Sequence, residues 1–212
     1  MVTLQKVHGS ENSFFLLDET QLKQPLTTSQ LAAFTKQVTN RQTGWLGGAD
    51  GVLAITDAPG TAGKMTVVNT DGSLAKLCGN GLRTVARYLS EKTGQSAFKV
   101  HTDFADLAVA KQSPLASGVP AYSVEISPVS FAAADLPFAN LGGDRIVDTV
   151  LPAIHPSLKF TAVAVPNPHL IAFVSKEELA SPDLERIGKM LNANNPYFPE
   201  GVNVTFAEIL GK

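Results

Sequence analysis

Short apolar or alternating segments, each ended by turn-forming residues, recur along most of this 212-residue chain and constrain its fold more than any other feature. Segments of about four to eight residues with this pattern are typical of β-strands. They predict strands at 2–7, 14–17, 52–56, 65–68, 97–102, 105–110, 122–126, 160–165, 170–174 and 202–206. Strands therefore dominate the predicted structure.

Three segments have helical spacing instead. From Asn80, apolar residues at 82, 85, 86 and 89 recur every three or four positions until Gly94. Ser29 is the predicted N-cap of a helix that closes near Asn40, and Ser181 caps a helix at 182–191. Because strands dominate and several long connections carry helices, we expect an α+β fold rather than alternating parallel α/β.

The chain divides where its Pro, Ala and Gly content rises, through residues 136–143. We therefore predict a first domain at 1–135 and a second at 136–212. Two loops between strands are predicted at 8–13 and 166–169. The first is polar, and polar loops are frequent places for functional residues.

Composition excludes several classes of function. Seventeen basic and 19 acidic residues leave a net charge of −2, so binding of nucleic acid by bulk charge is not expected. No apolar run reaches the roughly 20 residues of a membrane span, and the start of the chain lacks the apolar core of a signal peptide. The single cysteine, Cys78, allows no intramolecular disulfide and fits a reducing compartment, so we expect a cytoplasmic protein.

Cofactor and metal signals are weak. Residues 60–65 resemble a phosphate loop, but Ala58 stands where its first glycine should be and Met65 where Ser or Thr should follow the lysine. No dinucleotide-binding glycine motif is present, and His8, His101 and His155 have no spaced partner. We therefore expect neither a cofactor nor a metal.

The strongest candidate for chemistry is Cys78, which directly precedes the predicted helix at 80–94. A thiol at a helix start ionises more easily, and the free N–H groups there can bind a carboxylate or phosphate. Gly79 and Gly81 let the backbone approach a ligand closely. A lone cysteine is more often a small buried apolar residue, but packing alone does not need the flanking Gly-Asn-Gly.

Asparagines supply the second signal, because an uncharged side chain with both donor and acceptor suits an amino acid's ammonium and carboxylate groups. Five of them lie at strand ends or in loops marked by Gly or Pro: Asn12, Asn69, Asn80, Asn167 and Asn203. Each alone is more often a turn or cap residue. His169 could tune a thiol, although a lone histidine is more often structural.

Six motifs, taken together and in order, resemble the diaminopimelate epimerase family of cofactor-independent amino-acid epimerases. They are H-G-S-E-N-S-F at 8–14, G-A-D-G at 48–51, N-T-D-G-S at 69–73, C-G-N-G-L-R at 78–83, N-P-H at 167–169 and P-E-G-V-N-V-T-F at 199–206. Glu11 and Ser13 replace a family Gly and Asp, and Thr84 stands where a cysteine often follows the arginine.

The resemblance implies inversion of LL- to meso-diaminopimelate, in lysine and cell-wall precursor biosynthesis. One cysteine thiolate would take the α-proton while a second thiol protonates the opposite face, without a cofactor. Cys78 would be the first of the pair, and His169 would influence the protonation of both. The residues that would contact substrate are Asn12, Asn69, Gly79, Asn80, Asn167 and Asn203.

The resemblance also implies two similar domains, each a mainly antiparallel sheet wrapped around a central helix. The second cysteine motif does not occur in these 212 residues, so we expect a C-terminally truncated chain with an incomplete second domain that is inactive alone. Without a core helix, apolar strand faces at 160–165 and 170–174 would stay uncovered. That domain is then expected to self-associate, for example as a homodimer, or to be loosely ordered.

Other readings stay open. Proline racemases and phenazine-type isomerases are related in type, although Cys-Gly-Asn-Gly favours the diaminopimelate branch. Cys78 and His169 could instead be the nucleophile and base of a thiol hydrolase. A binding module without catalysis is the third alternative.

Overall fold

The computed structural model describes residues 3–75, 77–126, 128–136, 138–165 and 167–211. The chain forms two compact units, Met1–Ile126 (unit 1) and Ser127–Lys212 (unit 2). The sequence-based boundary, by contrast, lies between residues 135 and 136. Residues before that point join unit 2 because Ser130 pairs with Ala164 and Ala133 N donates to Asp144 O at 3.1 Å.

The described residues of unit 1 form eight strands in one sheet. They are β1 (Leu4–Gly9), β2 (Asn12–Asp18), β3 (Gly51–Thr56), β4 (Lys64–Asn69), β5 (Leu74–Ala75), β6 (Ala97–His101), β7 (Asp106–Gln112) and β8 (Ala121–Val124). Their order is β1-β2-β3-β4-β6-β7-β8, with β5 added to β4. The β2/β3 and β4/β6 pairs are parallel and the rest antiparallel, so the sheet is mainly antiparallel, as expected.

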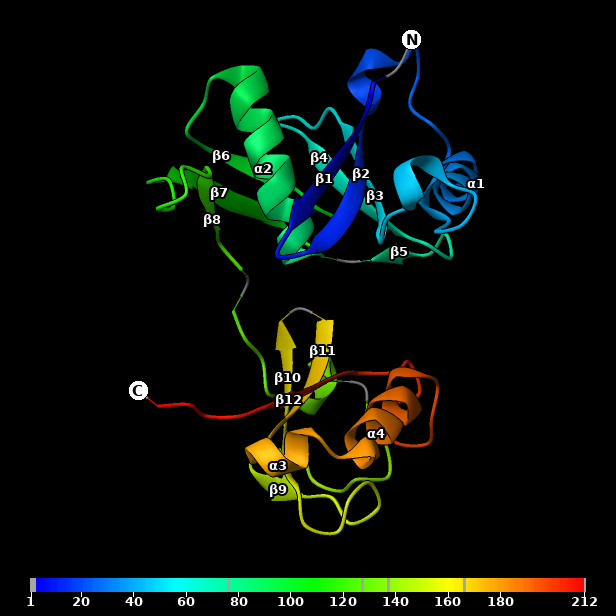
Figure 1. Ribbon diagram of the computed structural model, residues 1–212, viewed down its shortest axis with the longest axis vertical. Helices are drawn as coiled ribbons and strands as arrows, with labels where there is room; N and C mark the ends of the chain where they lie inside the picture. Colours follow the sequence, from blue (N-terminus) through cyan, green and yellow to red (C-terminus); the bar gives the residue numbers. More distant parts are fainter. Residues whose placement is uncertain (1–2, 76, 127, 137, 166, 212) are drawn as a thin grey trace. The chain divides into compact units, whose positions relative to one another are not determined.

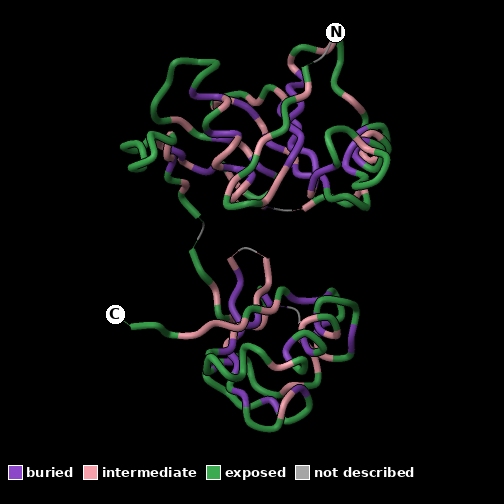
Figure 2. Tube along the Cα trace, in the orientation of Figure 1, coloured by how far each residue is buried: buried purple, intermediate pink, exposed green. Residues whose placement is uncertain are grey.

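The sheet wraps around helix α2 (Gly79–Thr93), which contacts β1 and β2 on one side and β7 and β8 on the other (Figure 1). The helix buries the apolar positions that gave its spacing in the sequence: Leu82, Val85, Ala86 and Leu89. Helix α1 (Thr28–Thr39) packs against β3 and β4 with a separate apolar cluster that includes Leu31 and Val38. Strand β3 is therefore buried on both faces, with Leu53 and Ile55 in the cluster of α2 and Val52 and Ala54 in that of α1. Figure 2 shows buried residues along the central strands.

Two local predictions in unit 1 are wrong. The N-cap of α1 is Thr27 rather than Ser29, because Thr27 and Gln30 form a reciprocal capping box. The predicted loop at 8–13 is a two-residue turn, in which Ser10 and Glu11 have φ values of 49° and 67°. Asn12 therefore lies on β2, not in a loop.

Unit 2 has a four-stranded sheet of order β12-β11-β10-β9. Its elements are a short 3-10 turn at Ala133–Asp135, β9 (Thr149–Val150), β10 (Lys159–Val165), β11 (Asn167–Phe173), α3 (Lys176–Leu179), α4 (Pro182–Asn192) and β12 (Asn203–Ala207). Two further 3-10 turns, Glu19–Gln21 and Trp45–Gly47, belong to unit 1. The β10/β11 hairpin is antiparallel and β12 pairs parallel to β11. The same order and pairing occur in β1, β2, α1 and β3 of unit 1, so the units are built alike.

The strands of unit 2 are better covered than expected. Phe160 and Leu170 are fully buried in a cluster with Leu184, Ile187 and Leu191 of α4. We expected the strand segments 160–165 and 170–174 to leave apolar faces uncovered. This is wrong for the sheet face that carries Phe160 and Leu170, because α4 packs on that face. The predicted loop at 166–169 is also wrong where it is described, since β11 begins at Asn167; Pro166 lies outside the described residues.

None of the helices in the described part of the chain combines the length and apolar character needed to cross a bilayer.

Asp18 at the end of β2 joins the sheet to the last turns of α2. Its buried carboxylate accepts hydrogen bonds from Tyr88 Oη at 2.6 Å, Lys92 Nζ at 2.7 Å and Thr20 Oγ1 at 2.6 Å. Burial alone would raise the pKa of Asp18, but these bonds outweigh it and lower that pKa to about 2. Burial, together with the same contact with Asp18, raises the pKa of Tyr88 to about 12. This network fixes how α2 lies on the sheet, and Cys78 is at the other end of α2.

Asp18→Asn is expected to lower the free energy of unfolding by about 2 kcal/mol at pH 7, because each pKa unit is worth about 1.4 kcal/mol. A lowered carboxylate pKa stabilises the fold above its unfolded value of 3.8, and that contribution is lost as the pH falls toward about 2. Urea unfolding should therefore show a difference in free energy of unfolding between Asp18→Asn and the unsubstituted chain at pH 7, and this difference should disappear as the pH is lowered to 2. Glu91→Gln, in an exposed pair with Arg87, is the control and should change stability by about 0.5 kcal/mol or less. Equal stability of Asp18→Asn and the unsubstituted chain at pH 7 would contradict the role of Asp18.

Candidate active site

Cys78 is the N-cap residue of α2, where its half-buried sulfur accepts a hydrogen bond from Gly81 N at 3.3 Å. Leu82 N closes the first helical turn by donating to Cys78 O at 2.8 Å. Within the described parts of the chain, nothing accepts a hydrogen bond from the backbone N–H groups of Gly79 and Asn80. The helix start therefore presents two unused donors beside a thiol, as the sequence predicts.

The structure explains why glycine occurs at position 81 but not why it occurs at position 79. A Cβ at Gly81 would lie 2.7 Å from Leu53 Cδ2, so close packing on β3 favours glycine there. A Cβ at Gly79 would meet no atom within 4 Å. The fold itself therefore does not require glycine at position 79. A ligand that approaches the backbone closely at this position would require it.

Asn12 meets Cys78 because the tight turn between β1 and β2 lies over the start of α2. Gly9 permits this approach, since a Cβ there would lie 2.9 Å from the carbonyl oxygen of Asn80. The Asn12 Oδ1 atom accepts a hydrogen bond from the Cys78 thiol, with 3.8 Å between Sγ and Oδ1. Two residues 66 positions apart in the sequence are thus brought together.

Asp50 completes this group from the loop before β3. Its Oδ2 atom accepts hydrogen bonds from Asn12 Nδ2 at 3.1 Å, Ser13 N at 2.8 Å and Ser13 Oγ at 3.0 Å. Burial would raise the pKa of Asp50, but these bonds and the positive charge of Arg41 lower it overall, so the carboxylate is ionised near neutral pH. Sequence reasoning gave Asp50 no role, although it lies in the G-A-D-G motif.

Asn80 and Asn69 occupy the same unit. Arg83 Nη2 donates to Asn80 Oδ1 and, at 3.0 Å, to Ser10 Oγ, so Arg83 ties the helix start to the β1/β2 turn. Asn69 pairs with Gly51 at the end of the β3/β4 ladder, and its Nδ2 donates to Ser73 Oγ at 3.0 Å. Arg83 was not predicted as a site residue, but its place in C-G-N-G-L-R is the signal that could have found it.

The three predicted site residues of unit 2 form a separate set. His169 on β11 pairs directly with Asn203 on β12, and Asn167 is two residues before His169 on the same strand face. Asn203 Nδ2 donates to Pro168 O at 3.2 Å. Burial lowers the pKa of His169, so its imidazole is neutral at physiological pH.

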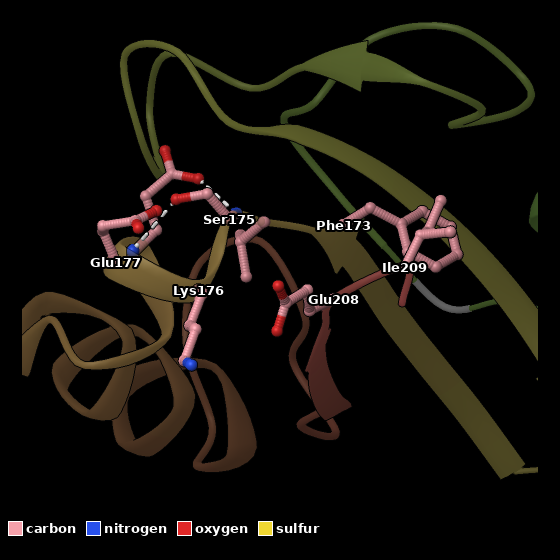
Figure 3. A pocket seen from close by; sticks show the side chains of 8 residues that line it. Phe173, Ser175, Lys176, Glu177, Glu208 and Ile209 are labelled. Carbon is pink, nitrogen blue, oxygen red and sulfur yellow. Dashed lines mark hydrogen bonds between the residues drawn. The ribbon is translucent and has the colours of Figure 1, made fainter. Parts of the chain in front are cut away.

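An open hollow of about 510 Å³ on unit 2 contains none of these residues (Figure 3). It is lined by Phe173, Glu208, Ile209 and the turn into α3. Ser175 and Glu178 use their polar groups in the capping box of that short helix. The charged residues Lys176, Glu177 and Glu208 also line the hollow, but it contains no thiol, and the thiol at the start of α2 is the better candidate. Across the described stretches, no three His, Cys, Asp or Glu side chains gather closely enough to hold a metal ion.

Two solved structures have a fold similar to that of this chain. A Bacillus anthracis phenazine biosynthesis protein of the PhzF family matches with a TM-score of 0.60 at 13% identity, over 100% of this chain and 68% of that protein. A probable proline racemase from Agrobacterium radiobacter K84 matches with a TM-score of 0.57 at 14% identity, over 97% of this chain and 66% of that protein. The chain therefore shares the α+β fold of these two proteins.

The chain belongs to the diaminopimelate epimerase family: the sequence model described as "Diaminopimelate epimerase" matches residues 4–113. Proteins named diaminopimelate epimerase are 54% identical in Enterococcus faecalis, over 100% of this chain and 65% of the relative, and 54% identical in Ligilactobacillus salivarius, over 97% and 63%. The chain thus spans about two-thirds of the length of these curated relatives. These findings favour the diaminopimelate branch over the proline and phenazine types.

Proposed function

We propose that this chain supplies one half of a diaminopimelate epimerase, which inverts LL- to meso-diaminopimelate in lysine and cell-wall precursor biosynthesis. The observation that carries the proposal is the Cys78 thiol at the start of α2, beside two unused N–H donors and the Asn12 amide. A thiol is an acid/base group, and free N–H groups at a helix start bind a carboxylate. The reaction needs both functions close together.

The proposed chemistry begins with the Cys78 thiolate removing the α-proton of one amino-acid centre. The electron pair left on the α-carbon is delocalised into the α-carboxylate, whose negative charge the N–H groups of Gly79 and Asn80 stabilise. A proton delivered to the opposite face of the carbon then gives the inverted centre. Asn12, Asn69 and Asn80 would contact the substrate from unit 1.

The proton on the opposite face must come from a group other than a second cysteine of these 212 residues, because Cys78 is their only cysteine. We therefore expect the chain alone to bind diaminopimelate without inverting it. In unit 2, Asn167 and Asn203 would contact substrate and the neutral His169 would influence thiol protonation. We place the protein in the cytoplasm, where a free thiol persists, and leave self-association as a homodimer to be measured by sedimentation.

The test follows deuterium exchange at the α-carbons of LL-diaminopimelate in D₂O. The 212-residue chain is compared with a fusion that adds the segments of the Enterococcus faecalis relative left outside the 213 aligned residues. We expect meso product with one α-deuterium from the fusion, and ligand-induced thermal stabilisation without turnover from the chain alone. Lysine, which lacks the second amino-acid centre, should be a poor substrate.

Gly79→Ala is the matched variant for binding, because the fold leaves room for a methyl group at this position. It should keep or slightly raise stability, as Ala is favoured over Gly in a helix by about 1 kcal/mol, and raise KM about tenfold or more. Full turnover by the isolated chain would contradict the expectation that it binds diaminopimelate without inverting it. A folded fusion that binds diaminopimelate without exchange, or an acyl group trapped on Cys78, would contradict the epimerase and favour a binding module or a thiol hydrolase respectively.

A further inference from the structure

We propose that Asp50 is a positioning residue that fixes the side-chain amide of Asn12 with its oxygen toward the Cys78 sulfur. The inference rests on the proposed function in that Cys78 is taken as the reacting group. Asp50 itself does not contact Cys78 and acts through Asn12. Without it, the amide could turn over and present its NH₂ group to the sulfur.

The argument starts from the donors and acceptors of the three groups. An ionised carboxylate only accepts hydrogen bonds, so the part of Asn12 that faces Asp50 must be its NH₂ group. The amide is planar, and its oxygen therefore points away from Asp50, which places it 3.8 Å from Cys78 Sγ. One carboxylate thus determines which end of the amide the thiol meets.

The carboxylate is itself held in place. Two donors of Ser13, the backbone N–H and the hydroxyl, bind the same Oδ2 atom as Asn12, at 2.8 and 3.0 Å. The backbone N–H of Asp50 donates to Ser13 O at 2.8 Å, which locks the loop onto β2. Arg41 binds the other oxygen, Oδ1, from an exposed position, so it contributes little to the orientation of Oδ2.

The orientation matters because the two ends of the amide have opposite effects on the sulfur. The oxygen accepts from the thiol and stabilises its protonated form, whereas an NH₂ group would donate to the thiolate and stabilise that form. Asp50 therefore determines which of these two hydrogen bonds Asn12 offers to the sulfur. A ligand ammonium group can replace the thiol proton as the partner of Asn12 Oδ1.

The test measures the alkylation rate of Cys78 by iodoacetamide at pH 7 in the 212-residue chain, where no other cysteine reacts. Asp50→Ala is expected to speed alkylation about threefold or more, because the freed amide can donate to the sulfur. In an Asn12→Ala background, the same substitution should change the rate by less than about 1.5-fold. This double-mutant cycle separates positioning from general loosening, which would act equally in both backgrounds.

A control variant sharpens the result. Arg41→Ala leaves the bonds to Oδ2 intact, so it should alkylate within about twofold of the unsubstituted chain. If Asp50→Ala does not fold, the Asn12 NH₂ signals in a ¹⁵N-labelled chain decide. We expect the hydrogen bond to the carboxylate to shift the chemical shift of one Asn12 NH₂ proton, and this shift to disappear as Asp50 is protonated in acid. Two NH₂ protons with the chemical shifts of a solvent-exposed amide would overturn the proposal.

Equal effects of Asp50→Ala in both backgrounds would also overturn it. The alkylation cycle needs no turnover, so its outcome is separate from that of the deuterium assay. Coupling between Asp50 and Asn12 in a protein that shows no epimerase activity would refute the proposed function alone. Epimerase activity without coupling would refute the positioning role alone.

Discussion

Replacement of Cys78 by alanine is expected to lower the rate of α-hydrogen exchange about 1000-fold or more in the fusion that carries the complete site. The thiol is the proposed base, and these 212 residues contain no other cysteine that could take its place. Deuterium incorporation into diaminopimelate, followed by mass spectrometry, measures the loss. Thermal stabilisation by the substrate should persist, because the N–H groups of Gly79 and Asn80 belong to the backbone.

Cys78→Ser is the control that separates chemistry from folding. Its hydroxyl can accept the hydrogen bond from Gly81 N, and serine is a favoured N-cap residue, so α2 should keep its stability. Alanine loses this cap at a cost of about 1 kcal/mol. Both variants should nevertheless be inactive, because a hydroxyl is a far weaker acid than a thiol. Exchange by Cys78→Ser at more than about a tenth of the original rate would contradict the role of the thiol.

Local rules predict α2 and its cysteine well. The spacing of its apolar residues gives the helix, and Gly94 ends it in the left-handed conformation that glycine adopts without strain. The start of α1 was predicted less well, because Thr27, Thr28 and Ser29 are all good capping residues. The choice depends on Gln30, which can return a bond to Thr27 but not to Ser29. That capping box was visible in the sequence.

The prediction for residues 167–169 in unit 2 is wrong because of a proline. Pro168 indicates a loop in the sequence, but in the structure it is the second residue of β11 and pairs with Ala164. A proline near the start of a strand is tolerated because few ladder bonds need its missing N–H. As a consequence, Asn167 and His169 lie on β11, paired with Val165 and Val163 of β10, rather than in the predicted loop.

The contacts around the thiol could not be predicted, because they depend on strand register. Asp50 and Asn12 are 38 residues apart, and they meet only because β2 pairs parallel to β3 with Phe15 opposite Val52. A shift of one residue would turn the side chains to the other sheet face. Sequence motifs therefore named Asn12 and Cys78, which the fold brings together, whereas the part of Asp50 and the orientation of the Asn12 amide required the structure.

Phe160→Ala is expected to lower the stability of unit 2 by about 3 to 5 kcal/mol, the usual cost of removing a buried phenylalanine ring. Phe160 on β10 is fully buried in the cluster with Leu170 and Ile187. Native-state hydrogen exchange of the β10, β11 and β12 amides measures the change for this unit. Exchange that is already fast in the unsubstituted chain would instead support the earlier expectation of loose order.

Phe173→Ala on the neighbouring strand is the matched control, because its ring is 64% exposed. Removal of this ring should change the free energy of opening by about 0.5 kcal/mol or less. The two phenylalanines share a chemistry and a sheet but differ in face, so their difference measures how much α4 contributes by covering one side. Similar losses from both substitutions would mean that the face of Phe173 is covered in solution, which self-association of unit 2 would explain and sedimentation would detect.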